Sequence, residues 1–418
     1  MRAPNQIHEA ARALDGARPR HAGGAGPGAV LARVVARGRE LGDGFRELRG
    51  KLVAYYLVRL RAQPAAVRGE RDLAALVAET YRRDPKHTAF LLERLCYDFV
   101  KGLRRSGGSG RAADFPRHLL GGSEAARALP EESLILLHAG LGMALTEILL
   151  LPLPRGSPAP AFAAALDSFF AQVEANARPE FAPVAFEALG LMVRRFMPHV
   201  HAPVEACLRA RDERLAAYYW RGAGRAIYFL PGLFHPFPGA VRRGLEICRR
   251  EPLEPRHRLD ALAGFCFAST MINLRYPELV ARLLPYLGPG EIEALASGVA
   301  GALLTRHHTS PDQPEVREFL RPLAADPSGR GAGPGAGDEG GPAADLAGLW
   351  ENAVRRPCLG ALDRAYPLLR ARGELACLAR HCPLGSLPTS ATPATPARQE
   401  APEVPGLPGA PEMPEMRE

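Results

Sequence analysis

A pair of histidines is the best candidate for metal chemistry in this sequence. His199 and His201 stand between two prolines, and Glu205 follows four residues after the second histidine. Two imidazoles in an extended turn can converge on one divalent ion when a carboxylate or a third histidine completes the set. His235 and His257 could supply that third ligand, although no sequence spacing links them to the pair. A polar turn whose histidines bond carbonyls or face water is the simpler interpretation.

The cysteines offer a second set of metal-ligand types. Cys358, Cys377, His381 and Cys382 lie near the C-terminus, but their spacing is irregular and no CxxC pair occurs. We therefore expect an arginine-rich amphipathic helix there, with zinc as the alternative. The chain has 7 cysteines, an odd number at wide spacing. That pattern favours free thiols in a reducing cytoplasm over a disulfide framework. We predict no bound cofactor, with a divalent metal at the histidine pair as the alternative.

The most distinctive stretch is YYWRGAGRAIYFLP, residues 218–231. Tyr219, Trp220, Arg221 and Arg225 could form a cation–π cluster that lines a ligand pocket or a partner surface. Aromatic residues at helical spacing more commonly pack inside a core, and this is the interpretation the pattern favours. The two glycines within the stretch lack the third glycine and the preceding strand of a dinucleotide site. We expect them to let two helices approach closely.

A nearly continuous apolar segment runs from residue 134 to 153, long enough to span a membrane. Glu147 lies within it and His138 adds a second polar group, and ionisable groups are costly in lipid. A central helix buried by its neighbours is therefore the favoured interpretation, with a span or interfacial segment as the alternative. Both side chains are predicted to be buried polar groups that need partners.

The elements that position these residues are predicted to be helices throughout. From residue 29 to about 308, apolar residues recur at the helical period, and prolines or glycines stop each segment. No stretch alternates as a strand would. The fold class is therefore all-α, either an α-solenoid-like stack or a compact helical array, because short links favour antiparallel neighbours. The predicted organisation is a disordered tail at 1–28, a main domain at 29–322, a Gly/Pro-rich linker at 323–343, a short helical module at 344–382 and a disordered Pro-rich tail at 383–418.

Composition and missing motifs exclude several functions. The 53 Lys+Arg exceed the 45 Asp+Glu only modestly, and the excess is spread without interleaved aromatics, so we expect no nucleic-acid binding. Only three of the basic residues are lysines, which together with abundant Ala, Gly and Pro indicates a GC-rich, bacterial genome. P-loop, GxSxG, HExxH and EF-hand patterns are absent. The first residues hold no apolar stretch of the length that a secretory signal has, which favours the cytoplasm.

One local resemblance adds context. The Gly-x-Gly-Arg-Ala-x-x-Phe run at 222–229 and LDALAGFCFASTMINLRYPEL at 259–279 resemble segments of an uncharacterised helical bacterial protein family. That family is associated with enediyne natural-product biosynthesis. The resemblance spans about residues 218–279 and implies a context in bacterial secondary metabolism. It carries no catalytic residues to this chain.

These observations favour a non-catalytic cytoplasmic protein that binds a protein partner, as a scaffold or accessory factor. The first alternative is an enzyme or small-ligand carrier with a pocket between helices, with or without a metal. The second is membrane association through 134–153.

Overall fold

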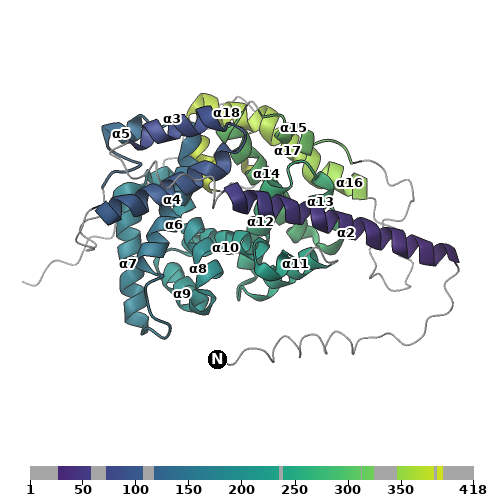
Figure 1. Cartoon of the computed structure of the whole chain (residues 1–418), viewed down its shortest axis with the longest axis horizontal. Coiled ribbons are helices and arrows are strands. Elements are labelled where there is room, and N and C mark those ends of the chain that lie inside the picture. The colour runs from purple at the N-terminus through teal and green to yellow at the C-terminus, as the bar shows by residue number, and fades with distance from the viewer. Residues whose placement is uncertain are drawn as a thin grey trace, which may run out of the picture.

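The computed structural model describes residues 27–57, 72–106, 117–234, 239–311, 313–323, 346–380 and 384–388. Every regular element within these ranges is a helix. The predicted all-α class is confirmed, and the helices form a compact array (Figure 1). The predicted tails and linker at 1–26, 324–345 and 389–418 lie outside the described residues.

Six helices form the centre of the molecule. They are α4 (Thr88–Ser106), α6 (Leu134–Leu149), α8 (Ala182–Phe196), α10 (Glu213–Tyr228), α12 (Pro255–Ile272) and α14 (Pro289–Thr309). Each packs against the next, and α14 also contacts α4, so the six close into a ring. Because the ring closes, the compact arrangement is found rather than an open solenoid.

The other helices lie around this ring (Figure 1). Along the chain they are α2 (Pro27–Tyr56), α3 (Leu73–Arg83), α5 (Glu124–Arg127), α7 (Ala159–Asn176), α9 (His201–Arg211), α11 (Ala240–Arg250), α13 (Pro277–Ala281), α15 (Glu315–Phe319), α16 (Leu346–Trp350), α17 (Arg356–Gly360) and α18 (Tyr366–Arg372). Short 3₁₀ turns join several of them: η4 (Glu131–Ser133), η5 (Pro179–Phe181), η6 (Pro198–Val200), η7 (Pro231–Leu233), η8 (Leu284–Tyr286), η11 (Leu375–Arg380) and η12 (Leu384–Ser386). The π-helical turns η9 (Glu351–Arg355) and η10 (Ala361–Ala365) lie between α16 and α18.

Glycines allow the ring helices to pack backbone against backbone. A Cβ atom on Gly222 of α10 would lie 1.7 Å from the carbonyl oxygen of Glu187 in α8. One on Gly264 of α12 would lie 1.8 Å from the carbonyl oxygen of Arg221 in α10. No side chain fits at such distances, so only glycine permits these crossings. The prediction that the glycines of residues 218–231 bring helices together is confirmed.

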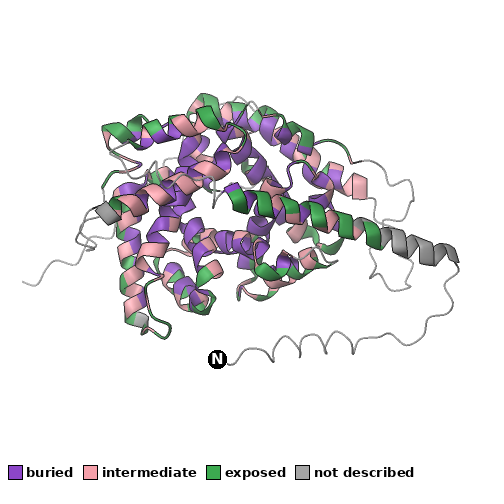
Figure 2. Cartoon of the chain, in the orientation of Figure 1, coloured by how far each residue is buried: buried purple, intermediate pink, exposed green. Residues whose placement is uncertain are grey.

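Helix α6 is a core helix. The stretch Glu131–Leu149 is the one candidate in the described chain that is long and apolar enough to cross a membrane, and 72% of its most apolar window is buried by the fold. Figure 2 shows the ring buried at the centre, with exposed residues on the outer helices. The burial supports the core interpretation over a membrane span, because its neighbours already cover the apolar surface.

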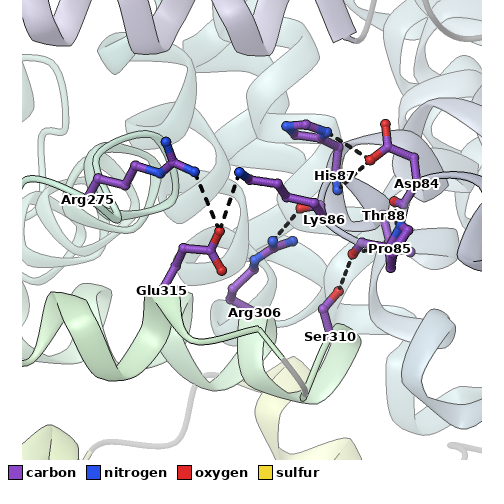
Figure 3. Close-up of polar contacts among 9 residues, drawn as sticks. All are labelled: Asp84, Pro85, Lys86, His87, Thr88, Arg275, Arg306, Ser310 and Glu315. Carbon is purple, nitrogen blue, oxygen red and sulfur yellow. Dashed lines mark hydrogen bonds and ion pairs between the residues drawn. The ribbon is translucent and has the colours of Figure 1, made fainter.

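A polar junction closes the ring where the end of α14 meets the turn between α3 and α4 (Figure 3). A guanidinium N–H of Arg306 donates to the carbonyl oxygen of Lys86, and the hydroxyl of Ser310 donates to that of Pro85 at 3.3 Å. Glu315 of α15 lies 3.9 Å from both Lys86 and Arg275. The ring is thus joined by main-chain carbonyls and a shared carboxylate as well as by apolar packing.

The predicted C-terminal module belongs to the main body. Trp350 is fully buried, its ring lies 5.6 Å from that of Phe319, and its indole N–H donates to the carbonyl oxygen of Arg321 at 3.4 Å. The guanidinium of Arg355 donates to the carbonyl oxygen of Leu320 at 2.7 Å. The module therefore packs on α14 and α15 and shares their hydrophobic core. The predicted tail from 383 also begins inside the fold, because Leu387 is buried.

Two predicted helix boundaries are wrong for local reasons. The residues from 203 to 229 form two helices, because Asp212 ends α9 and caps α10 by accepting a hydrogen bond from the backbone N–H of Arg214 at 2.9 Å. Conversely, the segments predicted on either side of Gly50 form the single helix α2. A Cβ on Gly50 would lie 2.8 Å from the Ile272 side chain, so this glycine serves the packing of α2 on α12.

Candidate functional site

A cavity of about 640 Å³ lies inside the ring. All six ring helices contribute to its wall, and α2 and η11 complete it. Its lining is mainly apolar, from residues such as Ala139, Met143, Leu191, Phe267 and Met271. Ionisable side chains stand at a few points on this wall. A concave, mainly apolar space of this size with a few convergent polar groups is the usual form of a small-molecule site.

Arg225 of α10 is the centre of the first polar cluster in the cavity wall. Its guanidinium lies 3.0 Å from the carboxylate of Glu187 on α8 and 3.3 Å from that of Glu93 on α4. It also lies 5.3 Å from the centre of the Phe267 ring. Burial alone would lower the pKa of Arg225, but the two carboxylates outweigh it and raise that pKa. One cation thus joins three ring helices through charge-assisted hydrogen bonds.

Glu147 belongs to the second cluster, with Tyr97 and Lys101 of α4. The Tyr97 hydroxyl and the Lys101 ammonium both donate to the Glu147 carboxylate, and the ammonium also donates to the Tyr97 oxygen at 3.1 Å. Burial alone would raise the pKa of Glu147, but these two donors lower it. The prediction that Glu147 is buried is wrong, since its side chain is 27% exposed and faces the cavity. The expected partners are present.

Helical spacing places both clusters on the cavity. Glu93, Tyr97 and Lys101 follow at intervals of four along α4, so their side chains share one face. Glu187 and Arg195 stand eight residues apart on α8, about 12 Å along the helix axis at 1.5 Å per residue. Glu187 and Arg195 therefore lie at two separate positions along the cavity wall.

The predicted metal ligands are not gathered. His199 is exposed in η6. Nδ1 of His201 lies 2.6 Å from the hydroxyl oxygen of Tyr219, within hydrogen-bond distance. Glu205 instead bonds Nδ1 of His257 at 3.1 Å. Among the described residues no group of three or more His, Cys, Asp or Glu side chains could hold a metal ion. The 3₁₀ turn that begins at Pro198 is only three residues long, so α9 begins at His201. The His201 ring therefore faces the core, whereas His199 remains in the exposed turn.

The four residues predicted to form a ligand or partner surface do not lie together. Three are buried in the core and one lines the cavity. Tyr219 and Trp220 are fully buried, and the Trp220 ring stacks on that of His201 at 5.2 Å. They cannot form a surface, so the core interpretation of the aromatic residues is confirmed. Arg221 is also buried. Burial lowers the pKa of its guanidinium, although the nearby carboxylates of Glu187 and Asp260 act to raise it. Of the four residues only Arg225 lines the cavity.

His138 is buried as predicted and is a structural group. Its Nδ1 bonds the carbonyl oxygen of Leu134 at 2.7 Å, and its Nε2 accepts the backbone N–H of Arg178 at 3.0 Å. The ring stacks on Phe181 at 5.2 Å. Burial lowers the pKa of His138 to about 4, so the imidazole is neutral near pH 7. Acceptance of an N–H by Nε2 requires that neutral form.

Burial raises the thiol pKa of four described cysteines, Cys96, Cys248, Cys266 and Cys358. Burial raises the pKa of the Cys358 thiol to about 12, which keeps it protonated. Cys377 is half-buried in η11. His381 and Cys382, the remaining members of the zinc alternative, lie outside the described residues, as does His235.

The sequence prediction missed Glu93, Tyr97, Lys101 and Glu187. A usable signal existed for Glu187, which is a lone carboxylate within the apolar run 182–193, as Glu147 is in its own helix. For the α4 residues the pattern of charges at intervals of four also describes an ordinary solvated face. Only the ring arrangement shows that this face points inward.

Comparison with known proteins gives no match. No family model fits the sequence, and no curated protein or solved structure is significantly similar to it. The resemblance to the enediyne-associated family stays a prediction.

Proposed function

We propose that the protein binds a small, largely apolar molecule in the cavity inside the helical ring, as a carrier or as an enzyme. The observation that carries this proposal is the cavity itself, about 640 Å³ in volume and reached by side chains from all six ring helices. Cores normally pack without voids larger than a water molecule, so a mainly apolar space of this size is well suited to a bound molecule.

The charges on the cavity wall support a polar group on the bound molecule. Four cations that line it have carboxylate partners: Lys51 with Glu47, Arg94 with Asp98, Lys101 with Glu147, and Arg225 with Glu187 and Glu93. Arg195 is different, since no ion pair with a carboxylate is found for it among the described residues. An acidic group on the ligand would pair with it.

Partly exposed apolar side chains support a ligand path to solvent. Phe196, next to Arg195, and Tyr55 of α2 both line the cavity and are both about half exposed. A ligand that enters past Phe196 would place its apolar part inside and its acidic group beside Arg195. We infer an amphipathic acid of a few hundred daltons as the ligand class, which fits a role in secondary metabolism.

A thermal-shift screen tests this function with purified full-length protein. The panel contains long-chain carboxylic acids, aromatic acids and their neutral alcohols. A ligand at 100 times its Kd stabilises the folded state by about 2.7 kcal/mol, which raises the melting temperature by several degrees. We expect at least one class of amphipathic acid to do so. Failure of every member of the panel, together with no small molecule retained in the native mass spectrum, would contradict the proposal.

A further inference from the structure

Helix α2 buries two charged side chains against the body, while most of its large apolar side chains face outward. The Glu47 and Lys51 side chains are buried against the body, with their carboxylate and ammonium 3.2 Å apart, and Lys51 also donates to the carbonyl oxygen of Leu233 at 2.9 Å. Arg282 of the α13–η8 link completes this buried ion cluster at 2.6 Å from Glu47. A surface helix normally does the reverse and buries its apolar stripe.

The outward face carries a continuous row of large apolar side chains, here called the α2 stripe. It consists of Leu41, Phe45, Leu48, Leu52 and Tyr55, with Val53 and Tyr56 beside it. Phe45 is 60% exposed and Leu52 51% exposed. A shallow depression of about 400 Å³ lies along the same face. Contiguous exposed apolar surface of this kind marks an interaction site far more often than single exposed residues do.

The spacing of the α2 stripe identifies the shape of its occupant. Its five members follow at intervals of four, three, four and three residues. That alternation keeps them in one line along the helix, as in the seam through which two helices pack knobs into holes. A flat membrane surface does not require this alternating spacing. The seam therefore fits one helix laid along α2.

The charges beside the seam identify the chemistry of the occupant. Arg37, Arg46 and Arg49 are exposed on α2, and of these only Arg46 has a carboxylate partner among the described residues, Asp43 at 2.9 Å. A second copy of the chain paired in parallel would set these arginines against the same arginines, which repel each other. Glutamate or aspartate beside the apolar row of a partner helix would instead pair with them.

We propose that the α2 stripe is the docking site for an acidic amphipathic helix of a partner protein. The partner helix presents apolar residues at the same seam spacing and carboxylates on its flanks. This surface is separate from the cavity, except that Tyr55 belongs to both. Phe45, Arg49 and Leu52, which the tests below change, do not line the cavity, so failure of the docking test would leave the cavity proposal standing.

Fluorescence anisotropy with designed peptides tests the proposal on the full-length protein. The probe is a labelled four-heptad peptide with Leu at the seam positions and Glu at the flanks, and its twin has Lys in place of each Glu. We expect the acidic peptide to bind at low ionic strength at least tenfold more tightly than the basic one. The Arg49→Glu variant should reduce that preference. Equal binding of both peptides, or no binding of the acidic one, would overturn the proposal.

A variant of the stripe and a matched control complete the test. Phe45→Ser with Leu52→Ser should weaken binding of the acidic peptide at least tenfold, because both side chains lie at the centre of the seam. Leu253→Ser changes an apolar residue that is 74% exposed elsewhere and should leave binding unchanged. Circular dichroism confirms that each variant folds. Unchanged binding to the double variant would contradict the assignment of the site.

Two further measurements distinguish other occupants. Sedimentation equilibrium reports the oligomeric state, and a wild-type dimer that dissociates in the double variant would show that a second copy covers the stripe. Co-sedimentation with phosphatidylcholine–phosphatidylglycerol vesicles reports membrane binding. Vesicle binding that is lost in the double variant, without peptide binding to the wild type, would assign the stripe to a membrane. Either result would overturn the proposal.

Discussion

Glu187 contacts α10 twice, through its backbone and through its side chain. Its carbonyl oxygen lies 1.7 Å from the position that a Cβ of Gly222 would take, and its carboxylate lies 3.0 Å from the guanidinium of Arg225. The close approach that the glycine permits thus sets the distance of the ion pair on the cavity wall. Fold and candidate site depend on the same contact between α8 and α10.

Substitution of Gly222 tests that contact. Gly222→Ala places a methyl group 1.7 Å from the Glu187 carbonyl oxygen, so α8 and α10 must move apart. We expect a loss of about 1–3 kcal/mol in the free energy of unfolding, the usual effect of overpacking, or failure to fold. Urea denaturation followed by circular dichroism measures it. Gly38→Ala is the control, because a Cβ there meets nothing within 4 Å and alanine should stabilise α2 by up to about 1 kcal/mol.

The ion pair itself can be tested with a double-mutant cycle. Arg225→Met removes the cation that pairs with the carboxylates of Glu187 and Glu93, and breaking a buried ion pair typically costs about 3–5 kcal/mol. Adding Glu187→Gln removes the buried carboxylate charge and should restore part of the loss. Denaturant unfolding of the two single variants and the double variant gives the coupling. Effects that simply add would show that the two side chains do not interact.

The buried imidazole of His138 predicts a specific pH dependence of stability. Its pKa is about 4 in the folded chain and 6.5 when unperturbed, so between these values the unfolded state binds more protons. The contribution of the neutral His138 to the free energy of unfolding is fully present above pH 6.5 and is lost as the pH falls towards 4. The loss is about 3 kcal/mol, at about 1.36 kcal/mol per pKa unit. In His138→Gln this loss is absent.

The measurement compares unfolding free energies of wild type and His138→Gln at several pH values from 7 to 4. We expect the variant to be less stable at pH 7, because it loses the bonds to Leu134 and Arg178, and the gap to narrow as the pH falls. His199→Gln, at an exposed histidine, controls for the substitution. A gap that stays constant over this range would contradict a neutral buried His138.

Arg195 is the residue that tests whether the cavity ligand carries an acidic group. If an acid pairs with that side chain, Arg195→Gln should weaken binding of cis-parinaric acid about tenfold and leave the corresponding alcohol unaffected. Fluorescence titration measures both. Arg194→Gln is a matched control, because Arg194 pairs with Glu251 at 2.6 Å and does not line the cavity. Equal losses of affinity for the acid and the alcohol would contradict the inference that the ligand carries an acidic group.

Periodicity made the helices predictable, and burial of the aromatic residues around Trp220 followed from the same pattern. The break at Asp212 was missed, because an apolar period continues through it while its capping hydrogen bond overrides that period. The separation of His199 from His201 was also invisible in sequence, since one residue decides where α9 begins. Local rules therefore gave the elements, with errors where a single side chain ended one.

The cavity could not be predicted, because it depends on contacts between distant parts of the chain. Arg225 was a candidate from its neighbours in sequence, but Glu93 lies 132 residues away and only ring closure brings it near. The α2 stripe was hidden for a related reason. Its residues form an ordinary amphipathic pattern, and only the packing of Glu47 and Lys51 shows that the apolar side faces outward.

Blocking the cavity is the most direct test of the proposed function. Met143→Trp with Leu191→Trp adds two large side chains to its wall. Wild-type protein titrated with the neutral fluorophore N-phenyl-1-naphthylamine should bind one molecule per chain, as should the Phe45→Ser, Leu52→Ser variant of the α2 stripe. The blocked variant should fold normally and lose this binding. Undiminished binding in the blocked variant, or its loss in the stripe variant instead, would contradict a ligand site inside the ring.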